Sequence, residues 1–332
     1  MQILMTEASY QRIADRLARI APDADIVTVT APETFTLRGK PIAVEDVRPE
    51  IVFFGFDSRA NTTNPTMFKR IFKGGGVTRW AQGQSAGVDA PVFRSVIQSG
   101  ARLTKSSAQA VPISEYVLSH ALSLLTPMET QAALQKQHVW KITPYREVSG
   151  TRWVMAGYGA IGKEIAKRAK AFGVHLTVVR RNVASDPLVD AMVGLDDFRR
   201  VSADADVVVL ACALNDQTRR MCDEAFFRGL KKGALLINIA RGGLVDEDAL
   251  RAGLERDQPR RAVLDVTAIE PLPAEHWLWD HPQVRVSAHT SFAGAGNKER
   301  LDEHFLENLR RYVAGEPLLQ EADPREIGAT PE

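Results

Sequence analysis

The sequence predicts an α/β protein of two domains, one of which carries a doubly wound parallel sheet. The first observation is that short apolar runs, typical of buried strands, alternate with amphipathic helical stretches along the chain. The second is a glycine-rich turn at residues 157–162, between an apolar run and a helix. The third is size: 332 residues, 45% of them hydrophobic and 25% charged, suffice for two globular domains.

The N-terminal part alternates strands and helices without a phosphate-binding turn. We expect strands at residues 2–5, 25–29, 51–56 and 78–82, and helices at residues 9–20, 66–72 and 90–98. Loops 57–61 and 85–89 follow the last two strands and could face a ligand. In the second loop, an anion such as a substrate carboxylate could bind the amides of Ala86, Gly87 and Val88. A plain glycine turn is the alternative.

The first domain is expected to end where an apolar helix begins. Residues 109–115 lead into this helix, which spans residues 116–125, and Pro112 lies near its start. The polar segment 128–148, which contains Trp140, is expected to be an arm or linker.

The glycine turn lies between two predicted strands, one at residues 153–156 and one in the run 175–182, and opens the helix that connects them. Gly157 permits a tight turn, Gly159 lets the backbone approach a pyrophosphate, and Gly162 lets the helix pack closely on the strand. The predicted cofactor contacts of this turn are Gly157, Tyr158, Gly159, Ala160, Ile161 and Gly162.

The end of the second of these strands indicates which dinucleotide binds. Arg180 stands where an acidic residue would accept hydrogen bonds from the ribose hydroxyls of NAD, and Arg181 and Asn182 follow it. Guanidinium groups bind a 2'-phosphate instead, so the sequence predicts NADP(H) in preference to NAD(H). The alternative is a pair of solvated surface arginines.

The remaining strands should complete a parallel sheet whose ligand crevice lies at the carboxyl ends of its strands. They are expected at residues 207–211, 234–239 and 262–266, with a helix at residues 247–256 between the last two. A further strand ends near Ser287. The last helix, at residues 304–313, could return the chain to the first domain.

Three residues follow strands of this second half and could carry chemistry: Arg241, Glu270 and His289. Histidine can transfer a hydroxyl proton, a carboxylate can orient the imidazole, and arginine can bind a substrate carboxylate and polarise its carbonyl. Taken singly, each has an ordinary explanation: a surface ion pair, a turn residue, a satisfied loop histidine. Together, downstream of a nucleotide fold, they indicate hydride transfer between a carbonyl and an alcohol.

The chain resembles the D-isomer-specific 2-hydroxyacid dehydrogenase family over nearly its whole length. The resemblance rests on the turn 157–162, the 238–250 block, Leu264-Asp265-Val266 with Glu270-Pro271-Leu272, His289, and residues 308–312. It implies a Rossmann-type dinucleotide-binding domain at residues 115–289. It also implies a discontinuous, flavodoxin-like substrate-binding domain at residues 1–114 and 290–332.

The resemblance implies roles for individual residues as well. Arg241 would bind the 2-oxo acid, His289 would be the acid/base, and Glu270 would orient it. The amides near Gly87 would hold the substrate carboxylate, and Trp140 would lie on an arm that in some relatives crosses to the partner subunit of a homodimer. Further cofactor contacts are implied at Ala213, Thr218, Ala240, His289 and, near the nicotinamide, Asp265.

Several positions depart from the family pattern. Arg180 replaces the aspartate of NAD-preferring relatives, Ala213 and Ala288 replace prolines, and residues 290–292 are unusual. Because proline fixes φ, its absence puts the fine geometry of both loops in question more than the reaction.

The composition argues against nucleic acid or membrane partners. Lysine plus arginine (42) nearly balance aspartate plus glutamate (41), and the net charge is +1. The N-terminus turns polar too early for a signal peptide, and no apolar run approaches the ~20 residues of a membrane span. Cys212 and Cys222 show neither a disulfide framework nor a metal-ligand pattern. We therefore expect a reducing cytoplasm, no metal, and Cys212 as a buried small side chain.

These observations together predict an NADPH-dependent reductase that converts a small 2-oxo acid, such as glyoxylate or hydroxypyruvate, into the D-2-hydroxy acid. Substrate choice should depend on loops around Arg59, Trp80 and Phe292. Two alternatives stay open. One is a nucleotide-sensing binding protein similar to transcriptional corepressors, and the other is an enzyme that oxidises phosphite or formate.

Overall fold

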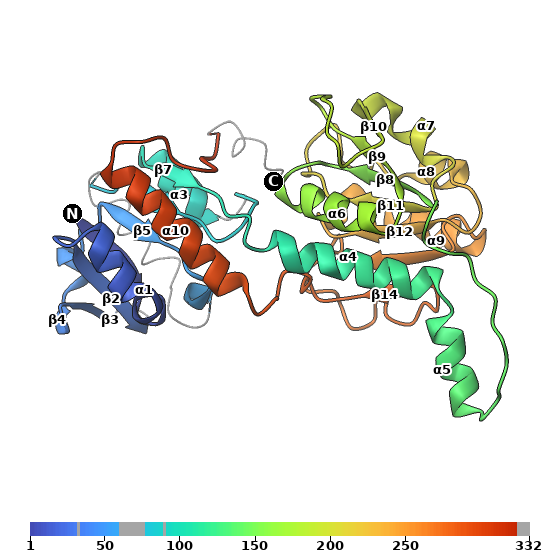
Figure 1. Cartoon of the computed structure of the whole chain (residues 1–332), viewed down its shortest axis with the longest axis horizontal. Helices are drawn as coiled ribbons and strands as arrows, with labels where there is room; N and C mark the ends of the chain where they lie inside the picture. Colours follow the sequence, from blue (N-terminus) through green and yellow to red (C-terminus); the bar gives the residue numbers. More distant parts are fainter. Residues whose placement is uncertain (32–33, 60–76, 89–90, 324–332) are drawn as a thin grey trace. The chain divides into compact units, whose positions relative to one another are not determined.

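The computed structural model describes residues 1–31, 34–59, 77–88 and 91–323. The chain divides into two compact units, a first unit of Met1–Gln109 with Ala295–Glu332 and a second unit of Ala110–Gly294 (Figure 1). The chain passes from one unit to the other at Gln109–Ala110 and back at Gly294–Ala295. The sequence analysis expected these two passages after residues 114 and 289. The difference arises because helix α4 (Ala110–Leu125) packs along its length against α6 (Ala160–Ala171) of the second unit.

The described part of the first unit holds a sheet of seven strands in the order β4-β3-β2-β1-β5-β6-β7. Pairing along β2-β1-β5-β6-β7 is parallel, which is the strand order of a flavodoxin-like sheet, and β3 and β4 add an antiparallel hairpin at one edge. The strands are β1 (Gln2–Thr6), β2 (Asp25–Ala31), β3 (Thr34–Leu37), β4 (Lys40–Ile42), β5 (Ile51–Phe53), β6 (Trp80–Gln82) and β7 (Arg102–Thr104).

Helices α1 (Glu7–Ile20) and α10 (Asn297–Val313) lie side by side in the first unit, and α3 (Pro91–Gln98) packs near β7 (Figure 1). One apolar core gathers under α1 and α10, where Phe53 stacks on Phe305 with ring centroids 4.2 Å apart. A second core lies around Phe93 of α3. The C-terminal helix is thus an integral layer of the first unit, because its apolar side chains complete that core.

The described residues of the second unit form a parallel sheet of seven strands in the order β10-β9-β8-β11-β12-β13-β14. The order reverses between β8 and β11, which makes the sheet doubly wound, and the ligand crevice of such a sheet opens at this switch point. The strands are β8 (Arg152–Ala156), β9 (His175–Val179), β10 (Ala191–Val193), β11 (Val207–Leu210), β12 (Leu235–Asn238), β13 (Arg261–Leu264) and β14 (Val284–Val286). The helices besides α4 and α6 are α5 (Met128–Lys136), α7 (Phe198–Ser202), α8 (Glu224–Gly229) and α9 (Glu247–Glu255).

The predicted fold class is confirmed, but several elements differ from the prediction. The strand expected at residues 51–56 ends at Phe53 and gives way to a 3-10 turn, Phe56–Arg59. The hairpin β3–β4 was not predicted; it turns at Arg38 and Gly39, which both have positive φ. Helix α10 begins at Asn297 rather than at residue 304. The prediction missed its first turns because they are mostly charged, and few of their side chains are buried. The expected helix at residues 66–72 lies outside the described residues.

The segment expected to be an arm or linker contains helix α5, which has no buried residue. An amphipathic pattern is the usual sign of a helix, and α5 lacks one because neither face packs on a core. In Figure 1, α5 and the chain that follows it extend away from the sheet of the second unit.

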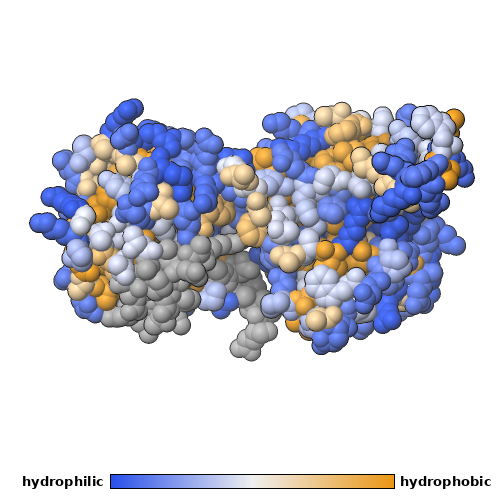
Figure 2. All heavy atoms as spheres, turned by 90° about the horizontal axis from the view of Figure 1, so that it is seen from below, coloured by the Kyte–Doolittle hydropathy of each residue, from blue (hydrophilic) through white to orange (hydrophobic). Residues whose placement is uncertain are grey.

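No helix within the described ranges is long and apolar enough to cross a membrane. Figure 2 shows hydrophilic side chains over much of the visible surface of each unit, with smaller apolar groups between them.

Candidate functional site

The glycine turn after β8 is closely packed at two positions and open at one. Gly157 has a φ of +101°, and a Cβ there would lie 2.4 Å from the carbonyl oxygen of Ala211, at the end of β11. A Cβ on Gly162 would lie 2.7 Å from the carbonyl oxygen of Gly157, so α6 packs directly on the turn. A Cβ on Gly159 would meet nothing within 4 Å. The backbone at Gly159 is therefore the part of the turn that another molecule can approach.

The N-terminus of α6 presents free backbone amides at this turn. Gly159 is the N-cap residue and makes no side-chain cap hydrogen bond, and Gly159 and Ala160 are exposed. Free amides and the helix dipole at such an end favour an anion. Tyr158 is buried, and within the described chain its hydroxyl has no hydrogen-bond partner. Burial, and next to it the nearby Asp186 carboxylate, raise the pKa of Tyr158 to about 12, so this hydroxyl stays protonated as a donor.

The two arginines after β9 carry charges that no acidic side chain neutralises. Arg180 is half-buried and Arg181 and Asn182 are exposed. Across residues 1–31, 34–59, 77–88 and 91–323, neither guanidinium forms an ion pair. This distinguishes them from the neighbouring Lys170, which pairs with Asp190 at 2.8 Å.

Two other predicted cofactor residues lie in the loop that follows β11. The hydroxyl of Thr218 donates to the carbonyl of Ala213 and accepts from the amide of Asn215, each at 2.8 Å. Thr218 is buried while Ala213 is exposed, so the hydroxyl of Thr218 shapes the loop and Ala213 is the accessible member of the pair. Ala240, after β12, is nearly buried, and its amide donates to Asn238.

Arg241 lies in a loop that packs against the segment carrying Glu270. A Cβ on Gly242, the residue after Arg241, would come within 2.0 Å of the Thr267 backbone, so the two loops touch without a side chain between them. Arg241 donates from Nη1 to the carbonyl of Ala240 at 2.6 Å. The positions that the sequence singled out after β12 and β13 are thus neighbours.

Glu270 and His289 form a direct pair. Nδ1 of His289 lies 2.9 Å from Oε2 of Glu270, and the other carboxylate oxygen accepts the amide of Thr267 at 3.1 Å. Because an ionised carboxylate only accepts, Nδ1 carries the proton and Nε2 is left for another molecule. Both side chains are accessible, 44% for His289 and 39% for Glu270. The ring of Phe292 stands edge-on to that of His289, with centroids 6.2 Å apart.

Asp265 holds the loop that carries His289. Its buried carboxylate accepts the amides of Thr290 at 2.8 Å and Ser291 at 3.1 Å, and the hydroxyl of Ser287 at 2.6 Å. The amide of His289 itself donates to the Asp265 carbonyl at 2.8 Å. The family resemblance implies a place near the nicotinamide for Asp265; in the structure its carboxylate is occupied by its own chain. The sequence analysis did not predict this role, because no local pattern indicates a contact between Asp265 and Thr290, which are 25 residues apart.

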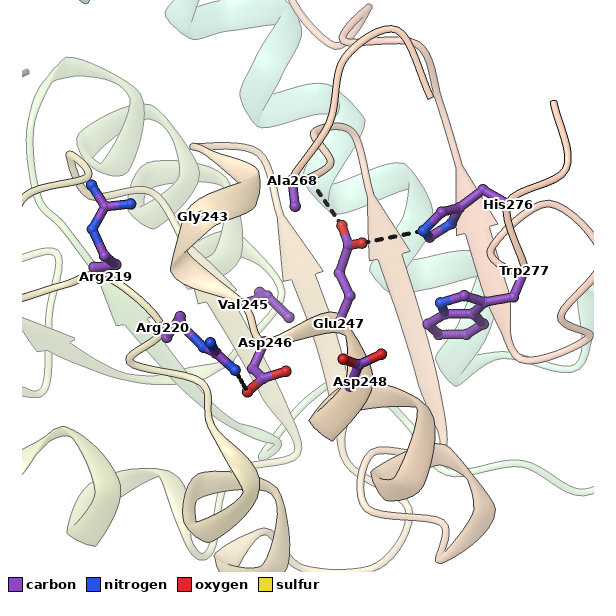
Figure 3. Close-up of a pocket in the computed structure, with 10 residues that line it drawn as sticks. All are labelled: Arg219, Arg220, Gly243, Val245, Asp246, Glu247, Asp248, Ala268, His276 and Trp277. Carbon is purple, nitrogen blue, oxygen red and sulfur yellow. Dashed lines mark hydrogen bonds and ion pairs between the residues drawn. The ribbon is translucent and has the colours of Figure 1, made fainter. Parts of the chain in front are cut away.

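A cavity of about 450 Å³ is lined in part by Ala268, which belongs to the segment between Thr267 and Glu270 (Figure 3). Within it, Glu247 at the start of α9 accepts the amide of Ala268 at 2.8 Å through one oxygen, and its other oxygen lies 3.6 Å from Nε2 of His276. The lining residues are Arg219, Arg220, Gly243, Val245, Asp246, Glu247, Asp248, Ala268, His276 and Trp277. The three candidate catalytic residues are not among them.

The predicted substrate loop of the first unit is described as far as Val88. The amides of Ala86, Gly87 and Val88 donate to no group among the described residues, while the Ser85 hydroxyl donates to the Gly87 carbonyl at 2.8 Å. The side chain of Val88 is buried in the core around Phe93. Free amides on a loop anchored in this way can form an anion site.

Two other expectations about the first unit change. Trp80 is completely buried and donates from Nε1 to Thr104 at 2.9 Å, so it belongs to the core and does not line a substrate loop. Asp57, in the other predicted loop, pairs with Arg12 and Lys298. Burial would raise the pKa of Asp57, but these two cations lower it below its usual value. The side chain of Arg59 lies outside the described residues.

Cys212 is largely shielded, and burial raises the pKa of its thiol to about 11. A thiol with this pKa carries almost no thiolate at neutral pH, so Cys212 is a poor nucleophile.

Comparison with known proteins gives a consistent result. Residues 118–291, just over half of the chain, match the sequence model described as D-isomer specific 2-hydroxyacid dehydrogenase, NAD binding domain. A crystal structure of a D-isomer specific 2-hydroxyacid dehydrogenase family protein from Aeromonas salmonicida subsp. salmonicida is similar with a TM-score of 0.76 and 26% identity. The alignment covers 97% of this chain and 98% of that one.

Two relatives with assigned names share part of the sequence. The chain is 34% identical over 184 residues to a glycerate dehydrogenase of Methylorubrum extorquens, which is 55% of this chain and 56% of that protein. It is 29% identical over 212 residues to glyoxylate/hydroxypyruvate reductase A of Serratia proteamaculans, which is 61% of this chain and 67% of that protein.

Proposed function

The chain belongs to the D-isomer specific 2-hydroxyacid dehydrogenase family, and we propose that it reduces a small 2-oxo acid to the D-2-hydroxy acid with NADPH as the reductant. The family is one of NAD(P)-dependent oxidoreductases. The observation that carries the proposal is the Glu270–His289 pair, which leaves Nε2 of an accessible imidazole for the substrate. The loop of Arg241 contacts the Thr267 backbone, whose amide Glu270 also binds. The names of the two relatives, a glycerate dehydrogenase and a glyoxylate/hydroxypyruvate reductase, support glyoxylate or hydroxypyruvate as the substrate.

The chemistry assigns one task to each residue of the site. Arg241 binds the substrate carboxylate and polarises the carbonyl, because a guanidinium offers paired donors to planar oxygens. A nicotinamide cofactor, when bound, would supply the hydride that the carbonyl carbon accepts. His289 then gives the proton held at Nε2 to the substrate oxygen, while Glu270 keeps Nδ1 protonated and stabilises the imidazolium. In the first unit, the amides of Ala86 to Val88, which donate to no described group, stay a predicted anion site.

The preference for NADPH rests on Arg180 and Arg181. A 2'-phosphate carries about two negative charges and accepts several hydrogen bonds, and the two unpaired guanidiniums offer matching donors. Gly159 and the uncapped start of α6 supply the approach and the amides that a pyrophosphate needs.

A homodimer is the proposed assembly, with residues 128–148, the arm that contains α5, as its contact. Trp140 is fully exposed, and Ile142 is 86% and Tyr145 58% exposed, so the arm carries an apolar surface without a partner on its own unit. A sedimentation measurement on the chain and on a variant with Trp140→Ser and Ile142→Ser would test this. The dimer should weaken in the variant, and a wild-type monomer would contradict the assignment.

The activity is tested by following NADPH absorbance with a panel of 2-oxo acids. We expect turnover with glyoxylate or hydroxypyruvate and a loss of about 1,000-fold or more in kcat for His289→Ala, with NADPH affinity unchanged. A nucleotide-sensing protein would bind NADPH without consuming it. A phosphite or formate oxidase would instead reduce NADP⁺ when given those anions.

The cofactor preference is tested by replacing both arginines with alanine. The loss of charged hydrogen bonds to a phosphate should raise the Kd for NADPH by about 10- to 100-fold and leave that for NADH within about 3-fold. Arg228→Ala is the control, since this exposed arginine pairs with Glu224 on α8. An equal loss of affinity for NADPH and NADH would refute the role of the pair.

A further inference from the structure

We infer that Tyr116 and Ser287 are positioning residues for His289: their hydroxyls form a chain of hydrogen bonds that fixes the Asp265 carboxylate, and this carboxylate fixes the backbone of the histidine loop. The inference rests on the proposed function, because it assigns these residues to the same site. Neither hydroxyl is proposed to touch the substrate or the cofactor.

The chain of hydrogen bonds is continuous. The hydroxyl of Tyr116 lies 2.7 Å from that of Ser287, and Ser287 Oγ lies 2.6 Å from Asp265 Oδ1. The same Asp265 oxygen accepts the amides of Thr290 and Ser291, so the series of hydrogen bonds runs from α4 to the two residues after His289.

The direction of each hydrogen bond follows from the number of protons. The Asp265 carboxylate already accepts two amides at Oδ1 and can only accept from Ser287. A serine hydroxyl has one proton, so once it is given to Asp265 the Ser287 oxygen must accept from Tyr116. Burial raises the pKa of Tyr116 to about 12, which keeps that phenol protonated as a donor.

The histidine loop needs such support because its backbone is strained. His289 has a φ of +48°, in the left-handed region that is unfavourable for a residue with a side chain. The three successive amides of residues 289–291 all donate to Asp265, to its carbonyl or its carboxylate. One residue therefore holds the strained segment, and its carboxylate fixes the backbone that carries the imidazole.

Residue 288 leaves the histidine loop without a covalent restraint of its own. It is alanine, so no proline ring fixes φ immediately before His289. The chain of hydroxyls supplies a different restraint, anchored on α4. That helix is a firm support, since the residues after Tyr116, Val117 and Leu118, are buried against α6 and β8.

The prediction is a slower chemical step with unchanged binding. Tyr116→Phe removes only the hydroxyl, and kcat should fall about 10-fold. The KM for the 2-oxo acid and the Kd for NADPH should stay within about 2-fold. With NADPH deuterated at the transferred position, the isotope effect on kcat should rise. Ser287→Ala should behave in the same way, and Ser287→Thr, which keeps the hydroxyl, should restore kcat.

Tyr312→Phe is a matched control, because its hydroxyl donates to Glu50 at the same distance, 2.7 Å, in the first unit. It should leave kcat and the isotope effect unchanged. Loss of stability alone would lower activity without changing the isotope effect, and Ser287→Thr would not rescue it.

Amide hydrogen exchange of residues 287–292 tests the same link without turnover. Exchange there should be faster in Tyr116→Phe than in the wild type and unchanged in Tyr312→Phe. If the wild type consumes no NADPH with any 2-oxo acid, the proposed function is wrong, and this measurement still decides whether the hydroxyls hold the loop. Unchanged exchange, or a Tyr116→Phe variant with wild-type kcat and isotope effect, overturns the inference.

Discussion

Two histidine–glutamate pairs flank the Thr267–Ala268 peptide of the second unit, and they are built differently. In the first, Glu270 binds the Thr267 amide and meets His289 at 2.9 Å. In the second, Glu247 binds the Ala268 amide, but His276 stands 3.6 Å away (Figure 3). The side chains of the first pair are 44% and 39% accessible, and those of the second 23% and 15%.

Under the proposed function, the difference separates a reactive pair from a supporting one. An imidazole that transfers a proton needs a fixed tautomer and a free nitrogen open to the substrate, and only His289 has both. His276 has its Nε2 turned toward Glu247, inside a wall of the cavity. Glu247 thus serves mainly to hold the Thr267–Ala268 peptide, and Glu270 is positioned by its own hydrogen bond to the Thr267 amide. The same two residue types have different roles because of geometry and exposure.

Breaking the reactive pair should have the largest effect. Glu270→Gln keeps an acceptor for the Thr267 amide but removes the charge that stabilises the imidazolium, so kcat should fall about 100-fold while NADPH affinity is retained. Steady-state kinetics with fluorescence titration of NADPH measures both. A kcat within about 3-fold of wild type would show that Glu270 does not act through His289.

Removing the supporting carboxylate should have an intermediate effect. Glu247→Ala leaves the Ala268 amide without its acceptor, so the free energy of unfolding should fall by about 1 kcal/mol and kcat by less than about 10-fold. Urea unfolding and kinetics on the same sample check this. Glu224→Ala is the control, because Glu224 also lies at the start of a helix but is 61% exposed. If Glu247→Ala lowered kcat as much as Glu270→Gln, the two pairs would not differ in function.

Replacing the second histidine should matter less. His276→Gln leaves Glu247 bound to Ala268, since 3.6 Å is too long for the histidine to be an essential partner. We expect kcat within about 2-fold of wild type. A larger loss, with full stability, would place His276 in the reaction.

The smallest expected effect is that of replacing Asp246 on the stability of the fold at low pH. Asp246 caps α9, the helix that begins with Glu247; burial would raise its pKa, but Arg220 and the Ala249 amide lower it. A carboxyl with a lowered folded-state pKa stabilises the fold above its unfolded pKa of about 3.9 and loses this contribution as the pH falls through the folded value.

Asp246→Asn retains a capping oxygen but does not titrate. Between pH 6 and pH 3, the free energy of unfolding should therefore fall less in the variant than in the wild type. The difference between the two decreases should be only about 0.5 kcal/mol, because solvent screens the pair with Arg220, which is 65% exposed. Urea unfolding at both pH values measures this. Parallel decreases in the two proteins would mean that the Arg220 pair contributes no stability.

The strand-end positions of Arg241, Glu270 and His289 could be predicted because parallel strands end at one edge of a sheet. The structure puts their loops in contact, while their catalytic roles stay a proposal. The orientation of Asp265 and the contact of Glu247 with Ala268 could not be predicted, because each joins segments more than 20 residues apart without a local pattern. Trp80 was misjudged for a related reason: a strand-end aromatic can face either a cleft or the core, and it faces the core.

The sequence by itself determined the alternation of strands and helices, the glycine turn and the arginines after β9, because each depends on local backbone geometry or on charge at a known strand end. The tertiary structure alone decided which of two histidine–glutamate pairs is accessible, and which side chains hold the histidine loop. Exposure and hydrogen bonding between distant segments depend on how the sheet and α4 pack. A linear pattern of residue types does not encode those distances.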